Sequence, residues 1–186
     1  MSDQRLYLVT PPAFEPAAFA SLLAEALEAG PVECVELRLA SGDEAGWRTA
    51  IEALRPVAQD RNAAFLLTDR AALAAETGCD GVALLSPQSY AEARRLVGPQ
   101  AIVGAWAGTS RHDAMTAGER GADFVGFAAD AELIDWWADL FEIPCVAYGG
   151  ITPETGPAFG KADFLALDDA VWGNSAGPAE GVRAFL

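Results

Sequence analysis

The chain alternates short apolar runs with longer segments of helical period, and the alternation repeats eight times over 186 residues. Such alternation is typical of parallel βα units, in which a helix returns the chain to the start of the next strand. The apolar runs are continuous, as expected for strands covered on both faces. We predict strands at Leu6–Thr10, Cys34–Ala40, Ala64–Asp69, Gly81–Leu85, Ala101–Ala107, Asp123–Ala128, Pro144–Gly149 and Phe164–Leu167.

The intervening segments predict helices that mostly follow Asp, Ser, Thr or Pro and often stop at a glycine able to adopt a left-handed conformation. They are Pro16–Glu28, Glu44–Asp60, Ala71–Thr77, Ser89–Leu96, Arg111–Arg120, Ala131–Leu140, Pro153–Phe159 and Gly177–Phe185, and the stop glycines are Gly30, Gly78, Gly98 and Gly121. Eight such units favour a closed (β/α)8 TIM barrel over an open doubly wound sheet. Because such barrels usually need about 200 residues or more, we expect a small one with an element shortened or missing. We predict a single barrel domain over residues 1–186.

Charge and hydropathy limit the partners of this domain. Hydrophobic residues make up 52% of the chain, and 27 acidic residues against 12 basic ones give a formal charge of −15. Binding to nucleic acid or to an anionic membrane is not expected, because either surface requires a basic patch. The sequence contains no apolar run of about 18 residues and no secretory signal, so we predict a cytoplasmic protein. Cys34, Cys79 and Cys145 are expected to be reduced thiols.

The candidate ligand site lies at the carboxyl ends of the strands, where TIM barrels hold their active sites. The residues that close the apolar runs there are Arg38, Thr68, Asp69, Gln88, Trp106, Gly149, Gly150, Asp168 and Asp169. Several of these have plain structural alternatives. Arg38 is suited to an ion pair with Glu36 or Asp69, and Asp69 to capping the following helix. Asp168 and Asp169 are suited either to a cation or to a cap or rim role.

Six motifs occur in the same order as in a known family and span nearly the whole chain. They are Leu6-Tyr7-Leu8-Val9-Thr10, Val35-Glu36-Leu37-Arg38, Thr68-Asp69-Arg70, Gly78-Cys79-Asp80-Gly81-Val82-Ala83-Leu84, Gly121-Ala122-Asp123-Phe124-Val125-Gly126-Phe127 and Ile143-Pro144-Cys145-Val146-Ala147-Tyr148-Gly149-Gly150-Ile151. Together they resemble the thiamine phosphate synthase and thiazole tautomerase family.

The resemblance implies a barrel enzyme that joins hydroxymethylpyrimidine diphosphate to a thiazole phosphate and releases pyrophosphate with the help of Mg²⁺. Arg38 occupies the position of the family's pyrophosphate-binding arginine. Asp69 matches a Mg²⁺-binding aspartate, whose hard oxygen suits a hard cation. Gly150, which follows Gly149, matches the backbone that donates N–H groups to the thiazole phosphate.

Departures from the family pattern remove positive charge and metal ligands from the strand ends. They are Glu36 for a Gln, Ala40 for a Lys, Thr68 for an Asn, Gln88 for a second Mg²⁺ carboxylate, Trp106 for a Ser, Ala128-Ala129-Asp130 for a longer Thr-x-Thr-Lys loop, and Asp168-Asp169 for a neutral phosphate-binding turn. Losing charge-assisted contacts worth about 1.5–3 kcal/mol each weakens diphosphate binding by several orders of magnitude when two or more are lost. The tautomerase branch offers no substitute, since its acid/base His falls on Ala128-Ala129.

Three hypotheses about function follow. The first is a divergent family member without diphosphate transfer that binds a smaller, less anionic molecule at the strand ends. The second is an active thiamine phosphate synthase that uses Mg²⁺ and draws the missing groups from Lys161 or Asp130. The third is a non-catalytic interaction module built on the Trp136-Trp137 helix, for which an exposed aromatic patch is the distinguishing feature. The sequence leaves a homodimer open.

Overall fold

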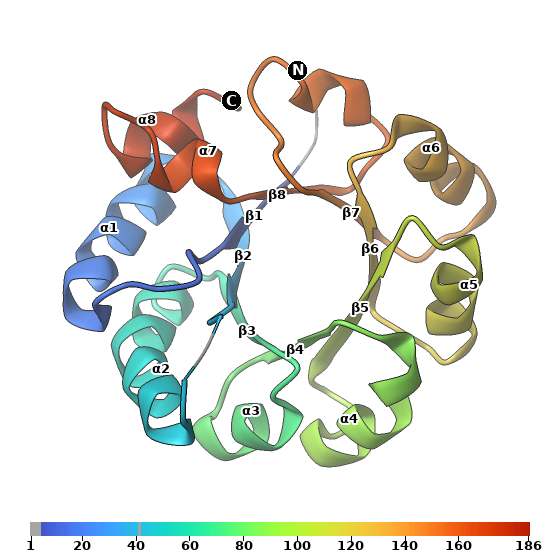
Figure 1. The fold of residues 1–186 in the computed structure, drawn as a ribbon, viewed down its shortest axis with the longest axis horizontal. Coiled ribbons are helices and arrows are strands. Elements are labelled where there is room, and N and C mark those ends of the chain that lie inside the picture. The colour runs from blue at the N-terminus through green and yellow to red at the C-terminus, as the bar shows by residue number, and fades with distance from the viewer. Residues whose placement is uncertain (1–4, 41) are drawn as a thin grey trace.

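Eight parallel strands close into a barrel in which each strand pairs with its neighbours in sequence and β8 pairs with β1 (Figure 1). This arrangement confirms the predicted (β/α)8 fold. The structure is a computed structural model that describes residues 5–40 and 42–186. The strands are β1 (Arg5–Val9), β2 (Val32–Leu37), β3 (Ala64–Thr68), β4 (Gly81–Leu84), β5 (Ile102–Gly108), β6 (Phe124–Ala128), β7 (Cys145–Tyr148) and β8 (Phe164–Leu167).

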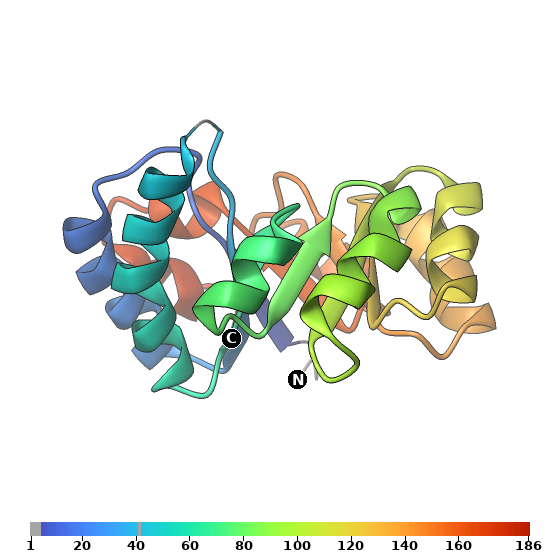
Figure 2. The same cartoon turned by 90° about the horizontal axis from the view of Figure 1, so that it is seen from below.

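Helices form a ring outside the barrel (Figures 1 and 2). They are α1 (Pro16–Ala29), α2 (Glu44–Gln59), α3 (Ala71–Thr77), α4 (Tyr90–Val97), α5 (Arg111–Glu119), α6 (Ala131–Leu140), α7 (Asp169–Trp172) and α8 (Pro178–Arg183), with 3₁₀ turns η1 (Pro87–Ser89) and η2 (Gly156–Phe159). The first six helices follow the predicted ranges closely. The described residues include no helix long and apolar enough to cross a membrane.

The last third of the ring differs from the prediction. The helix predicted at Pro153–Phe159 is only the turn η2, and the helix predicted at Gly177–Phe185 is shortened to α8. The short helix α7 was not predicted. Replacing a full crossover helix by one turn is how the fold fits within 186 residues. The expectation of a shortened element is therefore confirmed.

Three of the four stop glycines behave as predicted. Gly78, Gly98 and Gly121 have φ angles of 69°, 86° and 89°, in the left-handed region that favours glycine. The prediction is wrong for Gly30, whose φ of −173° is extended backbone. A Cβ on Gly30 would lie 2.7 Å from Leu186 Cδ1, so a larger residue there would require the exposed side chain of Leu186 to move.

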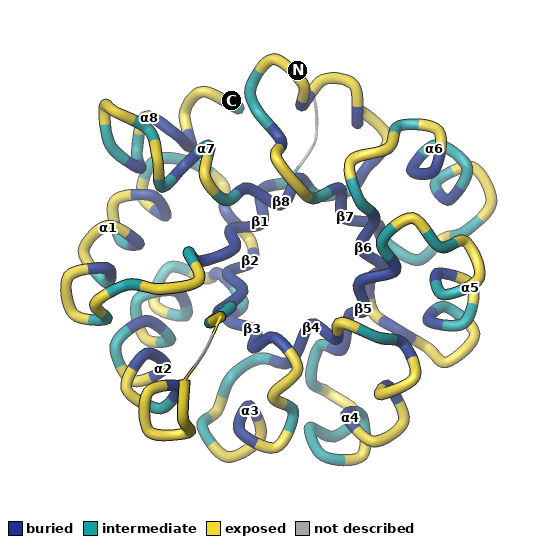
Figure 3. The backbone as a smooth tube through the Cα atoms, viewed as in Figure 1, coloured by how far each residue is buried: buried dark blue, intermediate teal, exposed yellow. Residues whose placement is uncertain are grey.

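Apolar side chains fill both the space between strands and helices and the interior of the barrel. The strands are mostly buried, whereas the outer parts of the helix ring are largely exposed (Figure 3). The interior cluster consists of Tyr7, Val9, Cys34, Leu66, Ala83, Trp106, Phe124, Val146 and Ala166. The barrel is thus a packed core with no pore, and ligands must bind at its ends. All three cysteines are free thiols, as predicted, and burial raises the pKa of Cys145 to about 11.

Three aspartates tie neighbouring strands together at the amino-terminal rim. Each precedes an even-numbered strand, and its Oδ2 accepts a hydrogen bond from a backbone N–H near the start of the preceding strand. The pairs are Asp80 with Phe65 at 2.7 Å, Asp123 with Val103 at 2.7 Å, and Asp163 with Cys145 at 2.8 Å. These aspartates stabilise the pairing of strands at the amino-terminal rim, and the candidate ligand site is expected at the opposite, carboxyl-end rim.

Candidate functional site

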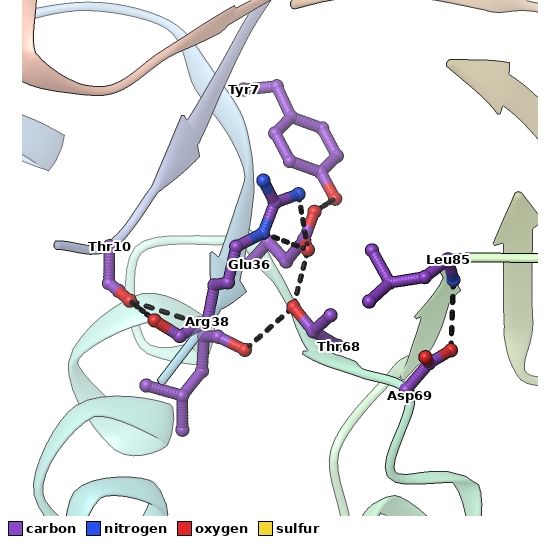
Figure 4. Close-up of polar contacts among 8 residues, drawn as sticks. Tyr7, Thr10, Glu36, Arg38, Thr68, Asp69 and Leu85 are labelled. Atoms are coloured by element: carbon purple, nitrogen blue, oxygen red, sulfur yellow. Dashed lines mark hydrogen bonds and ion pairs between the residues drawn. The ribbon is translucent and has the colours of Figure 1, made fainter. Parts of the chain in front are cut away.

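A fully buried carboxylate, Glu36, lies at the carboxyl end of β2 and joins three strand ends (Figure 4). Its Oε1 accepts hydrogen bonds from Thr68 Oγ1 at 2.5 Å and from Arg38 Nε and Nη2 at 3.1 and 2.8 Å. Its Oε2 accepts a hydrogen bond from the Tyr7 hydroxyl at 2.7 Å. Since β1, β2 and β3 are neighbours, closing the barrel is what assembles this network.

The network supplies hydrogen-bond donors to both oxygens of the buried Glu36 carboxylate. A buried carboxylate is costly unless it is paired and hydrogen-bonded, and here a guanidinium and two hydroxyls supply both. Burial, and then the negative charge of Glu36, raises the pKa of Tyr7 far above its ordinary value, so this hydroxyl remains a donor. Of the two ion-pair partners predicted for Arg38, the structure shows Glu36 rather than Asp69.

Arg38 keeps part of its guanidinium for a ligand. Its hydrogen bonds to described residues use Nε and Nη2, and about a third of its side chain, 33%, is exposed. Its Cζ lies 5.4 Å from the centre of the Trp106 ring, within the range of a cation–π contact. The backbone N–H of Arg38 is held by Thr10 Oγ1 at 3.0 Å. Nη1 is therefore the part of the side chain best placed to bind an anion.

Asp69 follows β3 directly and is held against the end of β4. Its Oδ1 accepts a hydrogen bond from Leu85 N at 2.9 Å, and its own N–H bonds to Ala83 O at 3.0 Å. Its φ of 50° is left-handed, a conformation that Asp tolerates better than most residues. The alternative role as a helix cap is wrong, because the cap position of α3 belongs to Arg70. Oδ2 remains for a ligand.

The described residues contain no group of three or more His, Cys, Asp or Glu side chains that could hold a metal ion by themselves. Mg²⁺ is commonly bound by only one or two carboxylates together with substrate phosphates. Asp69 therefore fits a Mg²⁺ ion that arrives with a diphosphate, and it does not fit a resident metal centre.

An aromatic wall faces Arg38. Trp106 on β5 is buried, with 5% of its surface exposed. The centre of its ring lies 4.3 Å from that of Tyr148 and 6.0 Å from that of Tyr7. Its side chain belongs to the apolar cluster that fills the interior of the barrel. The buried Nε1–H of Trp106 has no hydrogen-bond partner. Burial raises the pKa of Tyr148, against a smaller lowering effect of Arg38.

The remaining predicted site residues lie at other strand ends. Gly149 and Gly150 follow β7 with φ angles of 99° and 64°, and a Cβ on either would meet nothing within 4 Å. Asp168 caps α7 by accepting a hydrogen bond from Asp169 N at 2.8 Å, which is the cap role expected for this pair. Gln88 is exposed in η1, where its Oε1 accepts a hydrogen bond from Ser86. None of these joins the Glu36 network.

Neither substitute suggested for the missing family groups joins the Glu36 network. Lys161 precedes β8 at the amino-terminal side and pairs with Asp139 at 2.8 Å. Asp130 caps α6 through a hydrogen bond from Leu133 N at 3.2 Å. Both side chains have structural contacts, and Asp130, which follows β6, places an acidic side chain at the carboxyl-end rim.

The tryptophan pair on α6 separates into two environments. Trp137 is fully buried and donates from Nε1 to Ile143 O at 2.8 Å. Trp136 is half-buried, and the guanidinium of Arg111 lies over its ring at 4.6 Å. The broad exposed aromatic patch that would distinguish an interaction module is therefore missing from the described part of α6.

From the sequence, Tyr7 and Tyr148 were not identified as residues of the site, and Glu36 was treated as a change of charge and as one of two ion-pair partners for Arg38, not as the centre of a network. The sequence did contain a feature that points to this network. Glu36 shares the barrel-facing side of β2 with Cys34, two residues away, as alternation along a strand requires. A charged residue on the inward face of an apolar strand must find buried partners.

The fold and the polar strand ends define a (β/α)8-barrel protein with its candidate ligand site at the carboxyl-end rim. Comparison with known proteins identifies the family. The chain belongs to the thiamine monophosphate synthase family, whose model matches residues 6–167.

Curated relatives support the assignment over the full length. A thiamine-phosphate synthase of Rhodospirillum centenum is 51% identical, covering 100% of this chain and 97% of the relative. One of Hyphomonas neptunium is 40% identical, covering 97% and 91%. Among solved structures, a thiamine phosphate pyrophosphorylase from Pyrococcus furiosus has the same fold, with a TM-score of 0.86 at 24% identity and coverage of 99% and 94%. These findings favour the second hypothesis, an active synthase, over the first.

Proposed function

We propose that the protein is an active thiamine phosphate synthase, which joins hydroxymethylpyrimidine diphosphate to thiazole phosphate. The observation that carries the proposal is 51% identity along the whole chain to a relative of that name. Arg38 and Asp69, at the ends of neighbouring strands, are the residues of this chain suited to a diphosphate.

In this reaction the bond between the pyrimidine methylene and the diphosphate breaks, and the methylene carbon bonds to the thiazole nitrogen. Arg38 binds oxygens of the diphosphate through its Nη1 donors and stabilises the charge that develops on the leaving group. Asp69 would supply a carboxylate oxygen, Oδ2, to hold a Mg²⁺ ion. When bound, Mg²⁺ neutralises charge on the departing pyrophosphate.

The other substrate is placed by the seventh strand. The exposed backbone of Gly149 and Gly150 offers N–H groups to the thiazole phosphate, and the lack of side chains there allows close approach. The partly buried ring of Tyr148, supported from behind by the buried ring of Trp106, offers an apolar surface against which a flat heterocycle can pack. Restricting the two rings to this space favours their reaction.

The test is direct. The purified protein is incubated with both precursors and Mg²⁺, and thiamine phosphate is measured by chromatography, with Arg38→Ala and Asp69→Asn in parallel. We expect product from the unaltered protein and at least a hundredfold less from either variant. Folded protein that forms no product at saturating precursor concentrations would refute the proposal.

A second candidate function is a divergent barrel that binds a less anionic molecule without transferring diphosphate, and one observation favours it. Buried Glu36 already pairs with Arg38. Lys161 and Asp130, the two substitutes suggested for the missing family groups, are engaged with Asp139 and with the start of α6. This candidate predicts saturable binding of the uncharged hydroxymethylpyrimidine, measured by calorimetry, without product formation from its diphosphate.

A further inference from the structure

We propose that Glu36 tunes anion binding at the carboxyl-end rim by fixing the guanidinium of Arg38 in one orientation and cancelling most of its charge. Glu36 is thus a positioning residue that acts through Arg38 and does not itself contact the ligand. The inference deepens the proposed function, on which its relevance to a diphosphate rests.

The geometry fixes the orientation of the guanidinium. Two of its nitrogens, Nε and Nη2, donate to the single oxygen Oε1 of Glu36. The ring of Trp106 lies across the guanidinium at 5.4 Å. Turning the guanidinium would break two charge-assisted hydrogen bonds to a buried acceptor, which is far more costly than turning an exposed arginine. The donors of Nη1 therefore face a single direction.

Glu36 is itself fixed from the other side. The Tyr7 hydroxyl occupies Oε2 at 2.7 Å and Thr68 Oγ1 occupies Oε1 at 2.5 Å. These donors come from the strands on both sides of β2, so the carboxylate cannot leave the guanidinium without losing them. The ion pair is part of the barrel wall and does not depend on a flexible surface contact.

The same geometry sets the electrostatics. A bound anion meets the positive charge of Arg38 with a full negative charge 2.8 Å behind it. Coulomb's law with an effective dielectric constant of about 20 makes a unit charge several ångströms from a bound phosphate worth more than a factor of ten in affinity. Removing the charge of Glu36 should therefore tighten anion binding, whereas damage to the fold would weaken it. The sign of the effect distinguishes the two.

The experiment measures binding of inorganic pyrophosphate, with Mg²⁺ present, by isothermal titration calorimetry. The variants are Glu36→Gln, Arg38→Ala and the combination of both. We expect Glu36→Gln to bind pyrophosphate at least tenfold more tightly than the unaltered protein. The double variant should bind no better than Arg38→Ala alone, because Glu36 acts through Arg38.

Glu28→Gln is the matched control. Glu28 pairs with Arg61 on the protein surface at 2.5 Å, so the same substitution changes the net charge by the same amount away from the strand ends. Its pyrophosphate affinity should stay within twofold of the unaltered protein. The proposal is overturned if Glu36→Gln changes the affinity by less than twofold or weakens it. It is equally overturned if the gain persists without Arg38.

A measurement on the unaltered protein covers the case in which Glu36→Gln does not fold. The Nε–H of Arg38 should give a nitrogen-correlated NMR signal that exchanges slowly with water at neutral pH, identified by its loss in Arg38→Ala. Rapid exchange of that proton would contradict the fixed orientation. The binding of pyrophosphate is measured separately from the formation of thiamine phosphate. The inference can therefore stand when no thiamine phosphate is formed, and it can fail when product is formed.

Discussion

Placing an alanine at position 126 should show how tightly Trp106 is held in the barrel. Gly126 on β6 is the register partner of Trp106 on β5. A Cβ on Gly126 would lie 1.8 Å from Cε3 and 2.1 Å from Cζ3 of the indole, far inside any real contact. The ring cannot move away easily, because Tyr7, Phe124 and Tyr148 surround it.

The cost of Gly126→Ala can be estimated from this overlap. Overpacking a well-filled core typically costs about 1–3 kcal/mol. Because the new Cβ overlaps severely with two indole carbons, we expect Gly126→Ala to cost about 3 kcal/mol, at the upper end of this range. For a chain of this size each kcal/mol lowers the melting temperature by about 2–4 °C, so we expect a decrease of roughly 6–12 °C. Urea unfolding and thermal melting followed by circular dichroism measure both quantities.

A double-mutant cycle with Trp106→Ala tests the cause. Trp106→Ala alone should cost about 3 kcal/mol, at the low end for a buried tryptophan, because it also removes an indole N–H that has no partner. Gly126→Ala should then add little, since the overlapping ring is gone. Free energies that simply add, to within about 0.5 kcal/mol, would refute the proposed contact.

Three further predictions concern the rest of the barrel. Asp123→Ala removes the charged acceptor of the Val103 N–H and should lower the free energy of unfolding by about 2 kcal/mol in urea titrations. Cys145, with a pKa of about 11, should react with a thiol reagent at pH 8 only after denaturation, as a time course with and without guanidinium would show. The pKa of Tyr7 is raised on folding, so its neutral form contributes stability that is complete below pH 10 and is lost as the pH rises further. Tyr7→Phe should flatten this alkaline decline in melting temperature.

Each of these has a control in the same chain. Asp139→Ala removes an exposed carboxylate that, among the described residues, pairs with Lys161. A loss equal to that of Asp123→Ala would contradict the role of the rim hydrogen bond. Cys79 is less buried, so it should be the first thiol to react in folded protein. An unchanged alkaline decline in Tyr7→Phe would assign that decline to other groups.

The carboxyl-end rim shows where prediction from sequence reaches its limit. Arg38 and Asp69 were identified because they close two apolar runs, and that requires only the order of the chain. Their partners were uncertain, because Glu36 and Asp69 were equally plausible for Arg38 on local grounds. The structure selects Glu36, and it replaces helix capping by Asp69 with a hydrogen bond to Leu85, 16 residues away.

The seventh and eighth units show the same limit for secondary structure. Pro153–Phe159 has the composition of a helix, but only the turn η2 forms, and α7 appears where two aspartates end the last strand. Short segments carry too few residues for a periodic pattern to decide between a helix and a turn. The space left by neighbouring elements decides instead.

The sequence by itself determined the (β/α)8 barrel, its acidic surface and the strand ends that carry polar residues. These follow from hydrophobic periodicity, charge composition and the rule that the carboxyl ends of parallel strands meet at one rim. Only the tertiary structure decided that Tyr7, Glu36, Thr68 and Arg38 form one network, and that Trp106 lies opposite it. The reason is physical: a buried charge takes its partners from whichever strands closure brings beside it, and no local pattern records that choice.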